Sequence, residues 1–552
     1  MVDRFKLALA QLNPTVGAVD ANLAGAREAR AAAARDGADL VLFSELYIAG
    51  YPPEDLVLKP SFVAACGSAV EALAADTADG GPAVLIGTPW AQDGAVYNAV
   101  ALLDRGRVET VRLKHVLPNY GVFDEARVFA PGPVPGPVNF RGVRLGVPIC
   151  EDIWRDEVPE CLVETGAEML LVPNGSPWER DKPDLRLNIT VARVTETGLP
   201  LVYLNQIGGQ DELVFDGASF ALNADRSLAL QLPAFEPAVV TVEWQRAGAG
   251  WRVSGPVAPL DEGACSVWRA CVLGLRDYVD KNRFPGVVLG LSGGIDSAVV
   301  AAMAVDALGP ERVHCVMLPY RYTASESLED AHACAVALGC RYEVVPIEAP
   351  VAGFNAALEP LFAGLEPGVT EENIQSRSRG TLLMAISNKL GSMVLTTGNK
   401  SEMSVGYATL YGDMNGGFNP IKDVYKSEVY ALARFRNQQR SDGSLGPEGR
   451  VIPERIMTKV PTAELRENQT DQDTLPPYDA LDAILEDLVE HELSVAEVAA
   501  KGFDRATVER VQQMLYTAEY KRRQAAPGVK ITRKNFGRDR RYPITNGFRD
   551  RG

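Results

Sequence analysis

Residues 287–297, VVLGLSGGIDS, combine a buried-strand pattern with a turn that could bind a phosphate group. The apolar run that starts at Val287 is typical of a strand in a parallel sheet. Gly293 and Gly294 lack the side chains that would keep a phosphate away from the backbone N–H groups. The residues from Ser297 onward favour a helix that ends at Gly309. Because free amides gather at a helix N-terminus, the segment predicts a phosphate-binding turn.

This turn is not a Walker A motif, because no Lys directly follows a Gly before a Ser or Thr. Its SGGxDS form resembles the PP-loop of the ATP pyrophosphatases. That resemblance implies an enzyme that adenylates a substrate oxygen and releases pyrophosphate. An ordinary Gly-rich turn between a strand and a helix is the alternative. The strand, the paired glycines, Asp296 and the helix agree with one another, and they favour phosphate binding.

Three residues of the first half could cleave an amide: Glu45, Lys114 and Cys150, each at or just past the end of an expected strand. Such cleavage needs a nucleophile, a proton carrier and a positive group near the developing oxyanion. Cys150, Glu45 and Lys114 could fill these roles in that order, and the ammonium would favour the thiolate of Cys150. On residue type alone, a Cys packed in the core and solvated Glu and Lys side chains are the better interpretation.

The sequence around these residues changes that interpretation. Glu45, Lys114 within KHVLPNYGVFDE and Cys150 within PICED resemble, in order and spacing, the carbon–nitrogen hydrolase (nitrilase) superfamily. The resemblance implies an α-β-β-α sandwich with a Glu–Lys–Cys triad, and Glu125 matches a further acidic residue of such sites. The form LPNYGVFDE is similar to the glutaminase domains of NAD synthetases. On that likeness, three residues hold the glutamine substrate: Tyr120, Ser176 and Lys182.

Segments of the second half resemble the NAD synthetase family in its glutamine-dependent form. They are ENIQSRSRG, LTTGNKSE, YGDMNGGFNPIKDVYKSEV, PTAELRENQTDQDTLPPYDALD and the C-terminal KRRQAAPGVKITRKNFGRDRRYPITNGFR. The resemblance implies an ATP site formed by Gly290, Leu291, Ser292, Gly293, Gly294, Ile295, Asp296, Ser297, Thr397, Lys426 and Thr462. It implies a site for the dinucleotide substrate, deamido-NAD⁺, formed by Asn373, Arg377, Arg379, Glu402, Asp413 and Lys521. Asp296 and Glu402 are hard oxygen ligands suited to Mg²⁺ among ATP phosphates.

Together these resemblances imply the last step of NAD⁺ biosynthesis, in which deamido-NAD⁺ is amidated through an acyl-adenylate with release of AMP and pyrophosphate. L-glutamine, or ammonia as an alternative donor, would supply the nitrogen, and ammonia released at Cys150 would travel unprotonated through a shielded passage. Mg²⁺ would act with ATP, and we expect no prosthetic group. Two alternatives are a PP-loop ligase for another acid, such as GMP-, asparagine- or tRNA-modifying enzymes, and an amidase whose second half only senses nucleotide.

The expected strands and helices place these residues in two α/β domains. Short apolar strands alternate with helices from residue 5 to about 243, in keeping with a nitrilase-like sandwich. A helix over 264–280 and later βα units indicate a doubly wound parallel sheet of the PP-loop (Rossmann-like) kind, with ligands at the carboxyl ends of its strands. We expect a glutaminase domain over 1–245, a linker over 246–262 and a synthetase domain over 263–552. The polar, Gly-rich segment 436–449 predicts a mobile surface loop.

The composition of the 552-residue chain is that of a globular protein, with 46% hydrophobic and 23% charged residues. A formal net charge of −17 argues against a nucleic-acid partner. The eight Cys lack CxxC spacing and fit neither a disulfide framework nor a zinc site, which predicts a reducing cytoplasm. No apolar stretch approaches the about 18 residues of a membrane span, and the N-terminus does not read as a signal peptide. The family resemblance suggests a homo-oligomer, specifically a homo-octamer.

Overall fold

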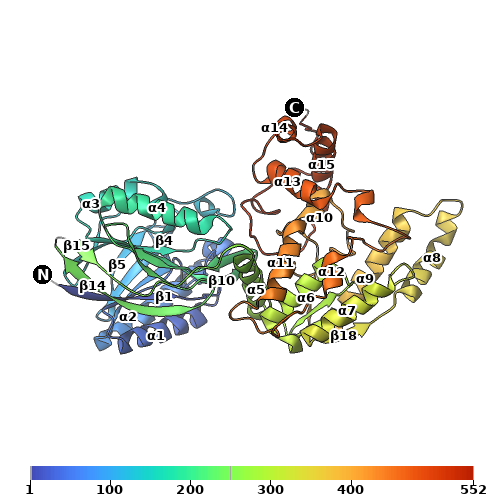
Figure 1. Cartoon of the computed structure of the whole chain (residues 1–552). Helices are drawn as coiled ribbons and strands as arrows, with labels where there is room; N and C mark the ends of the chain where they lie inside the picture. The colour runs from blue at the N-terminus through green and yellow to red at the C-terminus, as the bar shows by residue number, and fades with distance from the viewer. Residues whose placement is uncertain (1–2, 249, 551–552) are drawn as a thin grey trace. The chain divides into compact units, whose positions relative to one another are not determined.

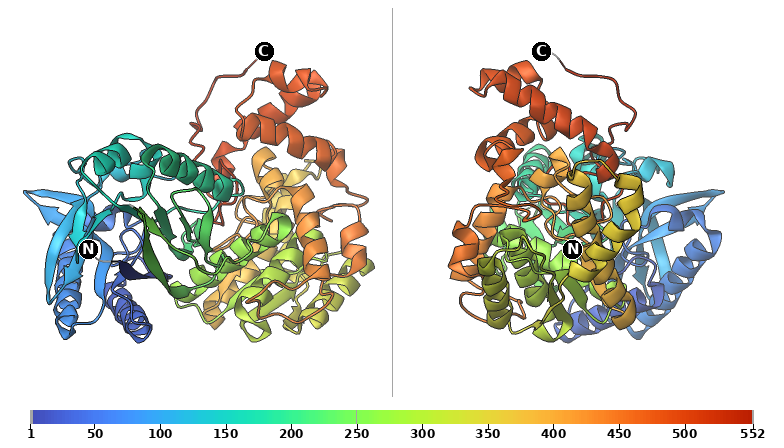
Figure 2. Two further views of the ribbon diagram at one scale, coloured as in Figure 1. Left: turned by 60° about the vertical axis from the view of Figure 1, so that its left-hand side comes forward. Right: turned by 90° about the vertical axis from the view of Figure 1, so that its right-hand side faces the viewer.

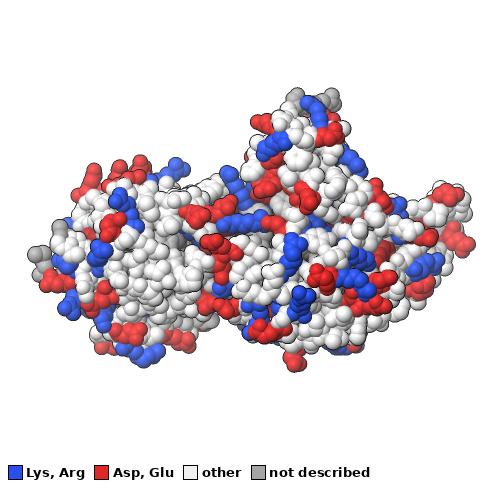
Figure 3. Space-filling view, in the orientation of Figure 1, with Lys and Arg blue, Asp and Glu red and all other residues white. Residues whose placement is uncertain are grey.

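The computed structural model describes residues 3–248 and 250–550, and the chain divides into two compact units, Met1–Asp261 and Glu262–Gly552 (Figure 1). Each unit has its own sheets and its own apolar core. On the face shown in Figure 3, acidic and basic side chains are interspersed over the surface of each unit. Within the described residues, no helix is both long enough and apolar enough to cross a membrane.

Two mixed β-sheets form the first unit. The strands of one sheet are, in spatial order, β15 (Gly250–Arg252), β14 (Ala238–Ala247), β1 (Arg4–Gln11), β2 (Leu40–Leu42), β3 (Ala83–Gln92), β4 (Ala95–Asp104) and β5 (Arg107–Leu113). Those of the other are β13 (Leu228–Gln231), β12 (Phe220–Leu222), β9 (Leu201–Asn205), β8 (Met169–Asn174), β7 (Val143–Gly146) and β6 (Val138–Phe140). Strands β10 (Ile207–Gln210) and β11 (Leu213–Asp216) pair separately. Pairing is parallel from β1 to β3 and from β7 to β9, and antiparallel elsewhere.

Alternating side chains along the strands separate the inner face of this sandwich from its outer faces. Leu7 and Leu9 of β1 point into a core that both sheets share, whereas Ala8 and Ala10 point the other way, toward helices. The helices on the two outer faces are α1 (Val19–Arg35) and α2 (Pro60–Asp76) on one sheet, and α3 (Glu157–Glu164) and α4 (Lys182–Thr197) on the other. The first unit is therefore the expected α-β-β-α sandwich.

Part of the segment expected to be a linker, 246–262, is instead β-strand. β14 continues to Ala247 and pairs antiparallel with β15, so that Arg246 lies opposite Trp251. The Arg246 guanidinium lies 4.5 Å from the centre of the Trp251 ring. Trp244 and Trp251 are both buried in the core between the sheets. Burial of these two large side chains outweighs the Gly and Ala content that suggested a linker.

The second unit is built around a parallel sheet with the spatial order β18 (Arg341–Val344), β17 (Val313–Met317), β16 (Val287–Gly290) and β19 (Met393–Leu395). The chain passes from β16 to β17 on one side and later adds β19 on the other side. The strand order therefore reverses between β16 and β19, where doubly wound sheets bind ligands at the carboxyl ends of the strands. The residues that directly follow these two strands are the PP-loop and residues 396–399.

Helices cover both faces of this sheet, and others lie beyond it. The helices of the second unit are α5 (Gly263–Lys281), α6 (Ile295–Leu308), α7 (Ser325–Leu338), α8 (Glu348–Phe362), α9 (Val369–Leu390), α10 (Lys400–Val405), α11 (Lys426–Gln438), α12 (Glu454–Thr458), α13 (Tyr478–Val489), α14 (Val495–Ala500), α15 (Arg505–Thr517) and α16 (Glu519–Arg522). Val288 packs under α8 and α9, while its neighbour Leu289 points to the opposite face and is also fully buried. Helices α13 to α15, orange to red in Figure 2, form a further apolar cluster with Val405 of α10 and Phe536 of the C-terminal tail.

The segment 436–449, expected to be a mobile surface loop, is instead fixed to the protein by a buried arginine. Helix α11 extends to Gln438, and the fully buried Arg436 donates from Nε to Asp306 Oδ2 over 2.7 Å. Its Nη2 donates to Asp306 Oδ1 over 3.0 Å and to the carbonyl of Pro447 over 2.7 Å. A buried guanidinium needs carboxylate and carbonyl acceptors, so it holds this polar segment in place.

Candidate active sites

The first candidate site is a buried cluster of one amine and two carboxylates. Lys114 directly follows β5, and its Nζ lies 2.7 Å from Glu45 Oε1. The same Nζ lies 2.9 and 2.8 Å from the two carboxylate oxygens of Glu125. The side chains of Lys114 and Glu45 have no solvent exposure, and Glu125 has 6%. Burial raises the pKa of Glu125 to about 7, against the lowering effect of Lys114.

Cys150 is placed beside this cluster on a strained turn. It begins a short 3₁₀ helix, η4 (Cys150–Trp154), and its φ of 46° lies in the left-handed region that favours glycine. The pKa of its thiol is raised well above the ordinary value, first by burial and then by the charge of Glu45. Lys114 acts in the opposite, lowering direction. Lys114 thus favours the thiolate, as expected, but burial and Glu45 outweigh its effect on the pKa.

Backbone N–H groups and one amide hold the acidic residues of the site. Asp152 Oδ2 accepts from the N–H of Ile149 over 2.9 Å, and its Oδ1 accepts from the N–H of Val116 over 2.8 Å. Asp152 thereby joins the turn of Cys150 to the segment that follows Lys114. Asn98 Nδ2 donates to Glu45 Oε1 over 2.7 Å. Sequence reasoning did not single out Asp152, although it stands inside the PICED segment, and nothing in the sequence around Asn98 marks it.

The three residues expected to hold glutamine surround this cluster. The Tyr120 hydroxyl donates to the carboxylate of Glu151, at 3.0 Å from Oε2. Burial raises the pKa of Glu151, while the charge of Lys182 acts to lower it. Lys182 begins α4, and its Nζ lies 4.8 Å from the centre of the Trp154 ring. Glu151 and Lys182 thus bring opposite charges to one site, and Glu151 is a residue that sequence reasoning missed.

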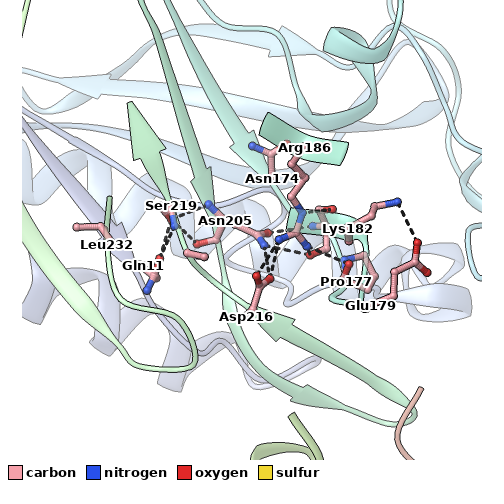
Figure 4. A network of polar contacts seen from close by, with 12 residues as sticks. Gln11, Asn174, Pro177, Glu179, Lys182, Arg186, Asn205, Asp216, Ser219 and Leu232 are labelled. Carbon is pink, nitrogen blue, oxygen red and sulfur yellow. Dashed lines mark hydrogen bonds and ion pairs between the residues drawn. The ribbon is translucent and has the colours of Figure 1, made fainter. Parts of the chain in front are cut away.

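Arg186 lies in a network of polar contacts (Figure 4), and Ser176 makes several hydrogen bonds to members of this network. Its N–H donates to Asn205 Oδ1 over 3.0 Å, and its Oγ accepts from Arg186 Nε over 3.1 Å. The preceding Gly175 donates its N–H to Glu45 Oε2 over 2.9 Å. The strand end that carries Ser176 therefore also holds the acid of the Glu–Lys–Cys cluster.

The second candidate site is a pocket at the carboxyl ends of β16 and β19. Its main part encloses about 1070 Å³ of empty space. Of the expected ATP-site residues, its lining contains Ser292, Gly293, Gly294, Ile295, Asp296, Ser297, Thr397, Lys426 and Thr462. A neighbouring pocket of about 960 Å³ shares Ser292 and Thr397 and adds Gly290 and Leu291. The structure thus brings every expected ATP-site residue to one connected region.

Lys426 bridges two carboxylates in this pocket. Its Nζ contacts Asp296 Oδ2 and lies 3.0 Å from Glu402 Oε1. Burial raises the pKa of Glu402 to about 8, with Lys426 acting to lower it, and the pKa of Lys426 is raised by Asp296 and Glu402 against its own burial. Asn399 caps α10 by accepting from the N–H of Glu402 over 2.9 Å, and it donates to Asp296 Oδ1 over 2.9 Å. These contacts fix the positions of both acids.

Asp296 and Glu402 fit Mg²⁺ as a pair of oxygen ligands. Their carboxylates share the Lys426 ammonium, so they face one another across a space that already accommodates a cation. Among the described residues, no group of three or more His, Cys, Asp or Glu is placed to hold a metal on its own. Mg²⁺ typically takes one or two carboxylates together with substrate phosphates and water, and this pocket could supply such a set.

The residues expected around the dinucleotide divide into two groups. Glu402, Asp413 and Arg379 line the two pockets. Asn373, Arg377 and Lys521 do not; they hold the segment 406–410 instead. Lys521 Nζ donates to the carbonyls of Gly406 and Ala408 over 2.8 and 2.7 Å, Arg377 Nε donates to the carbonyl of Leu410 over 3.1 Å, and Asn373 Oδ1 accepts from the Thr409 hydroxyl over 3.0 Å. Burial raises the pKa of Asp413 to about 6 and lowers that of Arg379 to about 10.

Comparisons with known proteins match both units of the chain. Residues 6–251 match the carbon–nitrogen hydrolase family, and residues 267–525 match the NAD synthase family. The chain is 55% identical to the glutamine-dependent NAD(+) synthetase of Rhodobacter capsulatus, over all of both chains. It is 50% identical to that of Xanthomonas campestris, over 99% of this chain and 98% of the relative. The solved structure of glutamine-dependent NAD⁺ synthetase from Acinetobacter baumannii, in complex with adenosine diphosphate, is 43% identical over all of both chains, with a TM-score of 0.79. The chain therefore belongs to the glutamine-dependent NAD⁺ synthetase family.

Proposed function

We propose that this protein converts deamido-NAD⁺ to NAD⁺ with ATP and glutamine. The observation that carries the proposal is the pocket beyond β16 and β19, where the PP-loop, Asp296, Glu402 and Lys426 meet in a chain that also contains the buried Cys150 site. We assign glutamine hydrolysis to residues 1–245 and NAD⁺ synthesis to residues 263–552. Cys66, Cys150, Cys161, Cys315, Cys334 and Cys340 are free thiols, in keeping with work in a reducing cytoplasm.

Hydrolysis of glutamine would begin with proton transfer from Cys150 to Glu45. Because burial and Glu45 raise the pKa of the thiol, the proton leaves as the sulfur attacks the carboxamide carbon rather than before. The Lys114 ammonium, held by Glu45 and Glu125, stabilises the negative charge that develops on the carbonyl oxygen. Glu45 then returns the proton to the departing ammonia. Water cleaves the remaining thioester to release glutamate.

Charge complementarity supports glutamine as the substrate of this site. An α-amino acid carries an ammonium and a carboxylate on the same carbon. Glu151 and Lys182 offer one negative and one positive side chain near Cys150. Tyr120 and Ser176 would add hydrogen bonds to the polar groups of the ligand. A carboxamide that lacked the charged α-carbon would offer no charged groups for Glu151 and Lys182 to contact, at a cost to binding.

Synthesis would take place in the second pocket. The backbone N–H groups of the PP-loop and the N-terminus of α6 would bind the ATP phosphates. Asp296 and Glu402 would hold Mg²⁺, which would neutralise phosphate charge during attack by the nicotinate carboxylate on the α-phosphorus. Lys426 would stabilise the pyrophosphate as it leaves. Adenylation turns a poor acyl donor into a good one, and ammonia then displaces AMP to form the amide.

Transfer of ammonia from Cys150 calls for a passage closed to bulk water, since ammonia in water at neutral pH is largely protonated and no longer nucleophilic. The proposed protein would have such a passage for ammonia. Ammonia supplied as its salt would be an alternative donor.

The proposed protein works as a homo-oligomer. Helix α8 is mostly apolar, with Glu348, Asn355 and Glu359 as its polar residues, and of its residues only Val351 is buried. Large apolar side chains on α8 and in the following turn are exposed: Phe354 by 47%, Leu361 by 73% and Leu365 by 69%. Figure 1 shows α8 at the outer edge of its unit, beside α9. Large exposed apolar side chains on one element can mark an interaction site, and a second copy of the chain, as in a homo-octamer, is the partner we propose.

A matched pair of variants tests the two half-reactions. In Cys150→Ala, NAD⁺ synthesis from glutamine should be lost, while synthesis from ammonium chloride should stay near the wild-type rate. In Asp296→Ala, synthesis should be lost with either nitrogen donor, because both reactions need correctly placed ATP. Glutamine-dependent synthesis by Cys150→Ala at the wild-type rate would contradict the proposed nucleophile. Ammonia-dependent synthesis by Asp296→Ala at the wild-type rate would remove Asp296 from the ATP site.

A further inference from the structure

Arg186 is a buried arginine of α4 whose guanidinium contacts several parts of the first site (Figure 4). Its side chain is 3% exposed, and Nη1 lies 2.7 and 2.9 Å from the two carboxylate oxygens of Asp216 at the end of β11. Nη2 donates to the carbonyls of Ser176 and Pro177 over 2.7 and 2.9 Å. Nε donates to the Ser176 hydroxyl over 3.1 Å. A planar guanidinium can serve all of these acceptors at once, which an ammonium cannot.

The contact with Nε fixes the direction of the Ser176 hydroxyl. A guanidinium only donates hydrogen bonds, so Ser176 Oγ must be the acceptor in this pair. The hydroxyl proton is then left to point away from Arg186. Ser176 is thereby set as a hydrogen-bond donor, either to the neighbouring Tyr203 hydroxyl or to a carboxylate or carbonyl oxygen of a ligand.

The contacts with Nη2 fix the backbone on which Ser176 stands. Asn205, at the end of the neighbouring strand β9, also holds Ser176. Its Nδ2 donates to the Ser176 carbonyl over 3.0 Å, and its Oδ1 accepts from the Ser176 N–H. Gly175, one residue earlier, donates to Glu45. Lys182 lies one helical turn before Arg186 on α4. Arg186 therefore ties together the residues proposed to bind glutamine and the backbone that holds the proposed general base.

We propose that Arg186 is a positioning residue of the glutamine site: held by Asp216, it orients the Ser176 hydroxyl as a donor and holds residues 175–177 against Glu45. This inference rests on the proposed hydrolysis of glutamine in the first unit. Arg186 itself does not touch the reacting atoms in this account. Its effect on the substrate passes through Ser176.

The experiment compares Arg186→Lys, Arg186→Met, Ser176→Ala and the double variant Ser176→Ala with Arg186→Met in the full chain. Glutamate release at varied glutamine concentration gives KM and kcat, and thermal unfolding reports stability. Arg30→Met is the matched control, because Arg30 is also buried in the first unit and donates to the carboxylate of Asp79 and the carbonyl of Pro82. NAD⁺ synthesis from ammonium chloride reports whether the second unit is intact.

In Arg186→Lys we expect a KM for glutamine raised about tenfold, the factor for one lost hydrogen bond to a charged ligand group, with a melting temperature near that of the wild type. The lysine keeps a positive charge beside Asp216 but cannot also reach Ser176. Arg186→Met should show at least the same rise in KM together with a lower melting temperature. Because Ser176 and Arg186 act through one contact, the double variant should have a KM no higher than that of the worse single variant.

A wild-type KM in Arg186→Lys, or additive effects in the double variant, would overturn the positioning role. So would an equal rise in KM in Arg30→Met, because the effect would then be one of general destabilisation. A wild-type chain that released no glutamate from glutamine would instead contradict the proposed function, and the inference with it. Ammonia-dependent synthesis should be unchanged in every variant.

Discussion

The thiol of Cys150 lies in a buried site where two opposite charges act on it. Glu45 raises its pKa and Lys114 lowers it, and burial decides the balance in favour of the thiol. The backbone φ of Cys150 is 46°, so the turn holds this residue in a left-handed conformation that residues other than glycine usually avoid. Thiol catalysis at such a site needs a base next to the nucleophile, and Glu45 is the base that we propose.

Opposite changes in thiol reactivity should follow from neutralising the two charges. In Glu45→Gln, the pKa of Cys150 should fall, since Glu45 raises it, and iodoacetamide should alkylate Cys150 faster than in the wild type at pH 8. In Lys114→Met, the pKa should rise and alkylation should be slower. Peptide mass spectrometry of Cys150 measures both rates in the absence of glutamine. Both variants should nevertheless lose glutamine hydrolysis.

The same direction of change in both variants would contradict the assignment of these charges. Cys161, which is partly exposed and lies in α3, serves as an internal control whose alkylation rate should not change.

At the residue scale, sequence motifs located the reactive groups but not the residues that hold them. Cys150, Lys114, Glu45 and the PP-loop stand in segments with recognisable order and spacing, and the structure gathers them into two sites. Asn98, Gly175 and Arg186 are common residue types far apart in the chain. Their role depends on distances that only the folded sandwich creates, so no local pattern could have indicated them.

Among the structural elements, the short helix α10 depends on the C-terminal tail. Lys400 begins α10, two residues before Glu402, and is fully buried. Its Nζ lies 2.7 Å from Asp423 Oδ1 and 2.5 Å from Glu490 Oε1, and it donates to the Thr532 hydroxyl over 2.6 Å. Asp423 also accepts from the N–H of Thr532 over 2.7 Å. The tail, the C-terminal end of α13 and the loop before α11 thus meet at one ammonium. This ammonium belongs to the residue two positions before Glu402, which lines the synthetase pocket.

Removal of that ammonium should destabilise the second unit. In Lys400→Met, Asp423 and Glu490 would be left buried without their cation, and we expect a loss of about 3–5 kcal/mol in the free energy of unfolding, measured by urea denaturation. NAD⁺ synthesis should fall with either nitrogen donor, because α10 carries Glu402. Lys534→Met is the control: Lys534 pairs with Glu492, which is 58% exposed, and its loss should cost about 1 kcal/mol or less. Equal losses of stability in Lys400→Met and Lys534→Met would contradict this role of the Lys400 ammonium.

At this scale, the family resemblance implied the sandwich, and the apolar run at 287–289 predicted the phosphate strand correctly, because a strand buried on both faces is apolar at successive positions. Predictions of a linker and of a mobile loop that were based on Gly and polar content alone were wrong in part. The segment around Gly250 was expected to be a linker, and Trp251 makes part of it a strand. The segment 436–449 was expected to be mobile, and the buried Arg436 fixes it. In both cases one large side chain outweighed the local Gly content.

For the molecule as a whole, the exposed apolar surface of α8 should control assembly. The double variant Leu361→Glu with Leu365→Glu should reduce the mass measured by light scattering, because charges on an apolar interface oppose its burial. Leu445→Glu is the control, since Leu445 is 56% exposed in the same unit but lies outside α8. An unchanged mass in the double variant would contradict assembly through α8.

The central claim is that one chain hydrolyses glutamine and uses the released ammonia to amidate an adenylated dinucleotide. The most direct test incubates the full chain with deamido-NAD⁺, ATP, Mg²⁺ and glutamine labelled with ¹⁵N in the side-chain amide, in the presence of excess unlabelled ammonium chloride as a competitor. Mass spectrometry should find the label in the amide of NAD⁺, with AMP and pyrophosphate formed in equal amounts. Formation of ADP and phosphate, or an absence of labelled NAD⁺ while labelled ammonia accumulates in solution, would contradict the account.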